Sequence, residues 1–251
     1  MNLARTFERI RFAGPFDVSF ETLSELQRAF LLHVPFENLD IHLRRHIAFT
    51  PKAVYNKVVE QHRGGFCYEL NSLFHDVLHE IGFDVQFHAA TMFRDGQPGT
   101  PMGHMVLSVK LGETRWLVDV GNGKFVREPL NFDGSTIARA EGMRYRIEDG
   151  AGVPRVLEAD EGSEWRTRFT FEAFPRERDD FNVVCEWTQS SPDSRFTQHQ
   201  ICTLALPDGG RVYLLDDRLT ITHGTSVEEH VIDASRRDEC LLDYFGIRLT
   251  L

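Results

Sequence analysis

Three residues that lie far apart in the sequence could together transfer an acyl group: Cys67, His104 and Asp119. A cysteine can serve as the nucleophile, a histidine as its base, and an aspartate as the group that orients the histidine. A thiolate suits this task because a thioester and an acyl-cysteine have similar energies, so the acyl group stays transferable. This chemistry requires that the fold bring the three side chains together.

The segment before Cys67 favours a reactive thiolate. Cys67 follows Gly64 and Gly65 and begins a predicted helix. A helix N-terminus presents unpaired amide groups and the positive end of the helix dipole, and both stabilise a thiolate. The glycines allow a sharp turn and the close approach of a substrate. The alternative is a small buried hydrophobic side chain, the commonest role of a free cysteine, and position alone does not distinguish the two.

His104 and Asp119 are predicted to lie on the two strands of one hairpin. Residues 104–111 and 114–121 flank a Gly-Glu pair, and a two-residue loop with glycine first suits a type II′ turn. Pairing across this turn places Asp119 opposite Val106, with His104 as its diagonal neighbour on the same face. Diagonal Cα atoms lie about 7–8 Å apart, so an imidazole and a carboxylate could meet there. The alternative is that His104 and Asp119 are two unrelated polar groups on one half-exposed strand face. A one-residue change of register would place them on opposite faces of the sheet.

The hydrophobic pattern divides the chain into three regions. Helical spacing of apolar residues in the first region predicts three helices, over 21–32, 51–62 and 67–81. From residue 84 to about 190 apolar residues alternate instead, which indicates strands. The last region predicts two strands and a closing helix, at 201–205, 212–221 and 233–245. The fold class expected from this order is α+β.

The composition is that of a globular protein with an acidic surface. The 251 residues carry a formal net charge of −10 without any basic run, so neither nucleic acid nor an anionic membrane is expected as a partner. No apolar run approaches the roughly 18 residues needed to cross a bilayer, and the charged first residues do not resemble a secretory signal. We therefore expect a cytoplasmic protein that acts as a monomer or small homo-oligomer.

The cysteines and histidines predict no metal site. The four cysteines form no C-x-x-C pair and match no zinc-binding spacing. His75 and His79 lie four residues apart on a predicted helix and could share a metal ion, but the sequence suggests no third ligand near them. Without a secretory signal the thiols are expected to stay reduced.

Six segments of the sequence resemble the arylamine N-acetyltransferase family, and together they extend from residue 34 to residue 249. The segments that carry the cysteine, the histidine and the aspartate occur in the family's order and at similar spacing. The six segments are 34–39, 63–67 with Asn71, 103–104, 118–121, 191–196 and 245–249.

This resemblance implies a fold in three parts. A helical bundle over 1–85 would carry the nucleophile, a β-barrel domain over 86–195 would carry the histidine and the aspartate, and an α/β lid would occupy 196–251. The core would be that of cysteine proteases and transglutaminases. This division agrees with the three regions of the hydrophobic pattern.

The resemblance also implies a reaction, which is ping-pong acetyl transfer from acetyl-CoA to the nitrogen of an aromatic amine or hydrazine. Cys67 would attack the thioester and become acetylated, His104 would move protons, and Asp119 would complete the triad. Backbone amides near Cys67 would hold the oxyanion. Acetyl-CoA is then a co-substrate, no metal or prosthetic group is needed, and a role in xenobiotic metabolism follows.

Further site residues are implied by the same resemblance. Arg63 and Glu37 resemble an ion pair that braces the catalytic helix, although solvated surface charges are the alternative. Phe36 and Phe196 resemble residues near the acyl and amine site, with an ordinary core role as the alternative. Three turn or loop residues would contact CoA or simply shape the chain: Thr100, Gly103 and Gly123.

One position departs from the family. Asn122 stands between Gly121 and Gly123, where the family usually has phenylalanine in the wall of the amine pocket. Asparagine would make that wall smaller and more polar, which predicts weak turnover of bulky apolar arylamines. Asn-Gly is also a favourable turn pair, so simple turn chemistry is the alternative.

Three other functions stay open on the sequence alone. An amide synthase of the same fold would take its acyl chain from a carrier-protein thioester and close a macrolactam. A cysteine hydrolase would use the same triad and transfer the acyl group to water. A catalytically silent binding module would keep only the fold, but an intact triad argues against it.

Overall fold

The first part of the chain is helical and is organised around α5 (Cys67–Ile81), which is buried along most of its length. The computed structural model describes residues 1–150, 152–160 and 162–249. Four helices precede α5: α1 (Leu3–Ile10), α2 (Phe20–His33), α3 (Leu39–His42) and α4 (Pro51–Tyr55). Within the described ranges, no helix combines the length and apolar character that crossing a membrane requires.

The helix boundaries follow from local chemistry. Ser19 caps α2 by accepting a hydrogen bond from the backbone N–H of Thr22, and α2 ends because Val34 precedes a proline. The predicted helices over 21–32 and 67–81 are confirmed. The predicted helix over 51–62 is only partly right, because α4 gives way to a π-helical turn at Asn56–Glu60.

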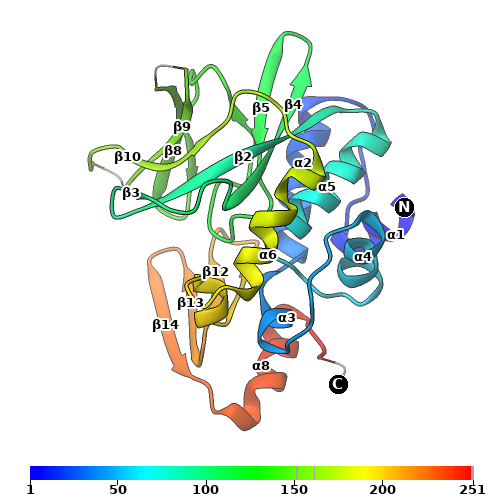
Figure 1. Cartoon of the computed structure of the whole chain (residues 1–251), viewed down its shortest axis with the longest axis vertical. Coiled ribbons are helices and arrows are strands. Elements are labelled where there is room, and N and C mark those ends of the chain that lie inside the picture. Colours follow the sequence, from blue (N-terminus) through cyan, green and yellow to red (C-terminus); the bar gives the residue numbers. More distant parts are fainter. Residues whose placement is uncertain (151, 161, 250–251) are drawn as a thin grey trace.

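An antiparallel sheet of nine strands follows and curls into a nearly closed barrel (Figure 1). Its strand order is β6-β5-β4-β2-β10-β9-β8-β7, and β3 pairs with β2. Leu130 of β6 and Tyr145 of β8 belong to one buried cluster, so the two ends of this order approach each other. The strands are β2 (Asp84–Arg94), β3 (Gln97–Pro98), β4 (His104–Leu111), β5 (Thr114–Val118), β6 (Leu130–Asn131), β7 (Ala138–Ala140), β8 (Met143–Asp149), β9 (Pro154–Asp160) and β10 (Arg166–Phe171).

The hairpin of β4 and β5 has the predicted register. Leu111 pairs with Thr114, and the pairing continues to Leu107 and Val118. Gly112 has φ +59° whereas Glu113 is not among the residues with positive φ, as a type II′ turn requires. Both faces of β4 are buried, one against the helices and the other inside the barrel.

The expectation of strands up to about residue 190 is wrong for the end of that region. After β10 the chain forms a 3₁₀ turn at Arg178–Phe181 and then α6 (Asn182–Ser190). Phe181 and Cys185, four residues apart, are both buried in the core that surrounds α5. Because burying Phe181 and Cys185 on one face requires helical spacing, a helix is the favoured structure here. This helix, α6, crosses the front of the molecule between the two sheets (Figure 1).

A smaller sheet with strand order β1-β11-β12-β13-β14 completes the fold. The predicted single return strand over 212–221 is wrong, because Asp216 adopts φ 55° in a second turn and divides it into β12 and β13. The closing helix is confirmed as a 3₁₀ turn at Ala234–Arg236 and α8, which buries Leu241 and Phe245 against the sheet. The remaining elements are β1 (Phe36–Glu37), α7 (Arg195–Gln198), β11 (Ile201–Ala205), β12 (Arg211–Leu215), β13 (Arg218–His223), β14 (Ser226–Val231) and α8 (Arg237–Phe245).

Candidate active site

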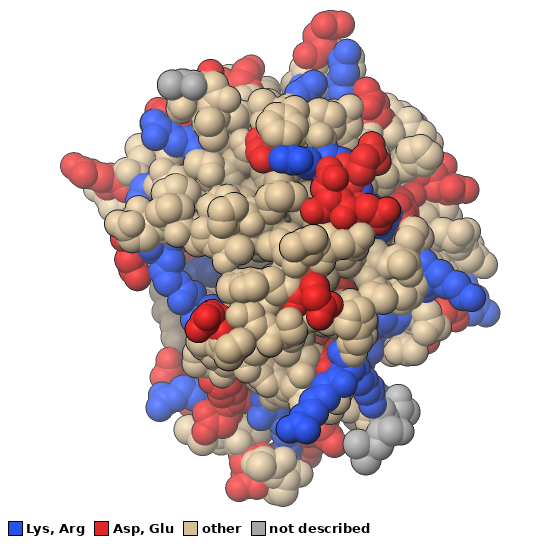
Figure 2. Space-filling model, in the orientation of Figure 1, with Lys and Arg blue, Asp and Glu red and all other residues tan. Residues whose placement is uncertain are grey.

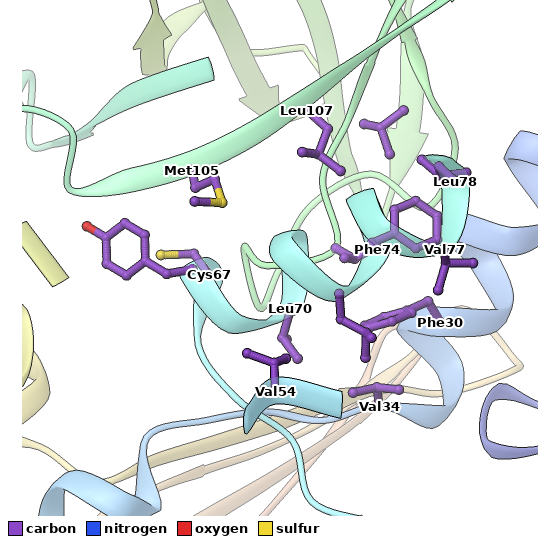
Figure 3. Close-up of a cluster of buried hydrophobic side chains, with 14 of the residues drawn as sticks. Phe30, Val34, Val54, Cys67, Leu70, Phe74, Val77, Leu78, Met105 and Leu107 are labelled. Atoms are coloured by element: carbon purple, nitrogen blue, oxygen red, sulfur yellow. The ribbon is translucent and has the colours of Figure 1, made fainter. Parts of the chain in front are cut away.

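Cys67 is the first residue of α5 and belongs to the same buried cluster as Met105 of β4 (Figure 3). Only 3% of the residue is exposed. Glu69 accepts a hydrogen bond from the backbone N–H of Phe66 at 3.1 Å, which fixes the start of the helix. The thiol therefore lies at the positive end of a well-capped helix and faces the strand that begins with His104.

The glycines before Cys67 serve the packing of the protein rather than a sharp turn. Neither Gly64 nor Gly65 has a positive φ. A Cβ on Gly64 would lie 2.0 Å from the carbonyl oxygen of Pro35, and a Cβ on Gly65 would lie 2.7 Å from a carboxylate oxygen of Glu69. The expected role in a sharp turn is thus wrong, and the absent side chains let β1 and α5 meet.

His104 and Asp119 meet as the hairpin register predicts. Nε2 of His104 lies 2.8 Å from Oδ2 of Asp119, and both side chains are almost fully buried. The other carboxylate oxygen accepts hydrogen bonds from Asn71 Nδ2 at 3.0 Å and from the backbone N–H of Gly121 at 2.9 Å. The pair is therefore held in one orientation by groups on both α5 and the loop after β5.

The charges of this pair reinforce each other. Burial alone would lower the pKa of His104, but the Asp119 carboxylate and hydrogen bonds to Asp119 and Cys67 outweigh burial and raise that pKa to about 10. Burial alone would raise the pKa of Asp119, but the charge of His104 and the donated hydrogen bonds keep it below its usual value. An imidazolium beside a carboxylate is thus the stable state at neutral pH, and the same ring contacts the Cys67 thiol.

Asn71 and Gly121 fasten the helix to the hairpin. Asn71 lies one turn after Cys67, donates a hydrogen bond to the carbonyl oxygen of Met105 at 2.7 Å and accepts one from the N–H of Val120 at 3.0 Å. A Cβ on Gly121 would lie 2.7 Å from the Cα of Cys67. Only glycine permits this close approach, which brings the loop after Asp119 against the cysteine.

A buried cluster of charges supports the start of α5. Arg63 donates to Oε1 of Glu37 from Nε at 3.0 Å and from a terminal nitrogen at 2.7 Å, as the sequence predicts. The sequence reasoning missed Lys57, which lies 2.8 Å from both Asp40 and Glu69. Burial alone would lower the pKa of Lys57, but the surrounding carboxylates raise it well above its usual value.

A cavity of about 1100 Å³ lies in front of these residues. Its lining does not include Cys67, His104 or Asp119 but does include neighbours of the last two, since Gly103 precedes His104 and Asn122 contacts the His104–Asp119 pair. All six residues predicted for the pocket and for CoA contacts line it: Phe36, Thr100, Gly103, Asn122, Gly123 and Phe196.

The cavity also has basic residues that the sequence reasoning did not single out. Lys124 from the loop after β5, Arg168 from β10 and Arg211 from β12 share this wall. Figure 2 shows the hollow between the barrel and the smaller sheet, with Lys and Arg atoms inside it and at its rim. No sequence motif marks these residues, because only the folded chain brings them to one wall.

The histidines and cysteines considered as metal ligands lie in other kinds of contact. Within the described ranges, no group of three or more His, Cys, Asp or Glu side chains could hold a metal ion. The His75 ring stacks on Phe87 at 4.0 Å and on His79 at 6.1 Å between centroids. All four cysteines are free and buried.

Comparison with known proteins gives one consistent result. Residues 19–251 match the sequence profile of a family described as N-acetyltransferase. The arylamine N-acetyltransferase of Mycolicibacterium smegmatis is 31% identical over 258 residues, covering 99% of this chain and 93% of the relative. The structure of the enzyme from Salmonella typhimurium superposes with a TM-score of 0.92 at 26% identity, covering 98% of this chain and 90% of that chain. The Mycobacterium marinum arylamine N-acetyltransferase in complex with CoA has a TM-score of 0.89 at 27% identity, with 98% and 93% covered.

Proposed function

The chain belongs to the arylamine N-acetyltransferase family and is an acyltransferase that transfers acetyl groups, and we propose that Cys67, His104 and Asp119 carry this reaction. Acetyl-CoA is the donor, and the nitrogen of an aromatic amine or hydrazine is the acceptor. The observation that carries the proposal is the buried 2.8 Å contact of the His104 imidazole with the Asp119 carboxylate. Cys67 interacts with the same imidazole and helps to raise its pKa.

The first half of the reaction loads the cysteine. The Cys67 thiolate attacks the thioester carbonyl of acetyl-CoA, and a new C–S bond forms as the carbonyl π electrons move to oxygen. Backbone amides near Cys67 stabilise this oxyanion. The intermediate then collapses, the bond to the CoA sulfur breaks, and His104 gives its proton to the departing thiolate. The products are acetyl-Cys67, free CoA and a neutral His104.

The second half unloads the cysteine. The amine nitrogen attacks the acetyl carbonyl, and neutral His104 takes the proton that the nitrogen loses. The bond to sulfur breaks, the amide leaves, and the thiolate beside the imidazolium is restored. Asp119 stabilises the charged ring in both halves, because its own charge is kept by the hydrogen bonds it accepts.

The cavity supports a large anionic donor. Its volume of about 1100 Å³ suits a nucleotide-sized molecule, and the Lys124 ammonium on its wall suits a phosphate group. A related enzyme of this family is known in complex with CoA. Thr100, Gly103 and Gly123 are proposed to contact CoA, whereas Phe36 and Phe196, whose ring centroids are 6.1 Å apart, are proposed to flank the acceptor.

The similarity to known enzymes and the assembled triad favour acetyl transfer over the three other functions considered from the sequence. Similarity to arylamine N-acetyltransferases over 99% of the chain favours acetyl transfer rather than macrolactam synthesis or hydrolysis, and the assembled triad argues against a silent module. We propose a cytoplasmic setting, which four unpaired cysteines and an acetyl-CoA donor both favour, and a role in acetylating foreign amines. Arg63 and Glu37 are proposed to brace the start of α5.

A panel of aromatic amines and hydrazines tests the proposed function. We expect release of CoA from acetyl-CoA to depend on the added amine and to be abolished in Cys67→Ser. The proposal fails if no amine stimulates release, or if the variant releases CoA as fast as the parent protein.

A further inference from the structure

Asn122 lies between the cavity and the His104–Asp119 pair. Its Nδ2 donates a hydrogen bond to Oδ2 of Asp119 at 3.0 Å, the same oxygen that binds His104. The same Nδ2 is 3.4 Å from Nε2 of His104. Asn122 also lines the cavity, so one side of the amide faces the substrate space and the other faces the catalytic pair.

The orientation of this amide decides what it does to the pair. With nitrogen toward Asp119, as observed, Asn122 adds a donor to the carboxylate. If the amide were flipped, its oxygen would face the carboxylate oxygen and repel it. That oxygen would also compete with Asp119 for the proton on Nε2 of His104. The flipped form would therefore weaken the bond that orients the imidazole.

Arg168 of β10 holds the observed orientation. One terminal nitrogen of its guanidinium donates to Oδ1 of Asn122 and to the carbonyl oxygen of Lys124, so it spans Gly123 and holds the loop at two points. The other terminal nitrogen binds Glu158 at 2.6 Å. The guanidinium also lies over the Phe125 ring, with its carbon 5.5 Å from the ring centroid.

The loop backbone is held by hydrogen bonds from the N–H of Gly121 to Asp119 and from the N–H of Lys124 to the carbonyl oxygen of Asn122, so what Arg168 fixes is the direction of the Asn122 side-chain amide. Asn122 is flanked by Gly121 and Gly123, which have no side chains to restrict it, and Gly123 has φ +75°. Arg168 itself is well anchored, because its side chain is only 16% exposed and the opposing Glu158 carboxylate is 13% exposed. A well-anchored guanidinium thus fixes the direction of the Asn122 amide.

We propose that Arg168 is a positioning residue for acetyl transfer, which acts through Asn122 to keep the Asp119–His104 hydrogen bond intact. The inference rests on the proposed function, because acetyl transfer is the reaction in which the His104–Asp119 pair would act. Arg168 makes no hydrogen bond to His104 or Asp119 within the described structure, so its effect on that pair passes through Asn122. Because Arg168 also lines the cavity, the KM for acetyl-CoA serves to detect any direct effect on the donor.

Two variants and a matched control test the proposal. Arg168→Met removes the donor to Asn122, and Asn122→Leu removes the amide itself. Arg166→Met is the control, because Arg166 lies on the same strand and binds the same Glu158 at 3.1 Å but is 58% exposed. For each protein we would measure Cys67 alkylation by iodoacetamide at pH 7, the single-turnover rate of CoA release, and the KM for acetyl-CoA.

We expect Arg168→Met and Asn122→Leu each to slow alkylation and CoA release about tenfold, with KM changed by less than about twofold. The double variant should be no slower than either single variant, and Arg166→Met should match the parent. Multiplied effects in the double variant, a rise in KM without a fall in rate, or an equal loss in Arg166→Met would each overturn the proposal.

The design separates this inference from the proposed function. If the parent protein releases no CoA, the proposed function fails, and alkylation of Cys67 still tests the role of Arg168. If Arg168→Met does not fold, as judged by thermal unfolding, Asn122→Leu decides alone. Parent-like alkylation in that variant would contradict the inference.

Discussion

At the scale of single residues, the site depends on how completely Asp119 is bonded. Each of its two carboxylate oxygens accepts two hydrogen bonds, from His104 and Asn122 on one side and from Asn71 and Gly121 on the other. A carboxylate held in this way keeps its charge and its direction. It can therefore orient and stabilise the imidazolium without taking its proton.

Asp119→Asn tests this electrostatic role. The substitution keeps the shape of the side chain but removes the charge that raises the pKa of His104, so the pKa falls and the imidazolium is lost at a lower pH. We expect acetylation of Cys67 at pH 7 to slow by about 10²-fold or more, and the alkaline limit of the pH–rate profile, near pH 10 in the parent, to move down. A profile that keeps its alkaline limit would contradict this assignment.

Asn122→Phe tests the wall of the acceptor site. Phenylalanine would make this wall more apolar, so we expect the ratio of kcat/KM for bulky apolar arylamines to that for small polar ones to rise by roughly tenfold. The overall rate should fall, because the hydrogen bond to Asp119 is lost. The measurement is a comparison of amines at saturating acetyl-CoA, and an unchanged ratio would refute the predicted acceptor preference.

At the scale of elements, catalysis requires that α5 stay fixed against the β4–β5 hairpin. The sequence predicts the hairpin register because a Gly-Glu loop sets it and alternation on both strands agrees with it. It predicts α5 because apolar residues recur at helical spacing up to Gly82. It does not predict α6, because only two buried side chains, Phe181 just before the helix and Cys185 within it, mark the face that packs on the core, and two residues are too few to show a helical period.

Asn71→Ala tests the link between α5 and the hairpin. The change leaves the N–H of Val120 and the carbonyl oxygen of Met105 without their partner in a buried site, so we expect a loss of about 2–4 kcal/mol in the free energy of unfolding. Urea unfolding measures it. Ser72→Ala is the control, because Ser72 is also fully buried but makes only a weak contact to the Met105 sulfur, and equal losses would argue against the link.

Lys57→Met tests the charge cluster beneath the start of α5. Removing the ammonium leaves Asp40 and Glu69 buried without the cation that lies 2.8 Å from each. We therefore expect the free energy of unfolding to fall by about 3–5 kcal/mol. Lys52→Met, an exposed lysine in the preceding helix, should change the stability by less than about 0.5 kcal/mol. Chemical denaturation of both variants gives the comparison, and equal losses would show that the cluster adds little.

At the scale of the whole molecule, the cavity exists because the barrel and the smaller sheet face each other across α6 (Figure 1). The family resemblance names six pocket residues that all line this cavity, and two of them, Phe36 and Phe196, lie far from the triad in the sequence. The sequence cannot indicate Arg168, which lies 46 positions from Asn122 and meets it only after the barrel has curled. The three-part division into 1–85, 86–195 and 196–251 stays our proposal, although β1 pairs with β11 and joins the first part to the last.

The most direct test of the account is the mass of the Cys67 peptide after incubation with acetyl-CoA without any amine. We expect one acetyl group on Cys67, discharged quickly by an aromatic amine and slowly by water, and no acetyl group in His104→Gln. Absence of the modification in the folded parent protein, or its presence on another cysteine alone, would contradict the central role assigned to this thiol.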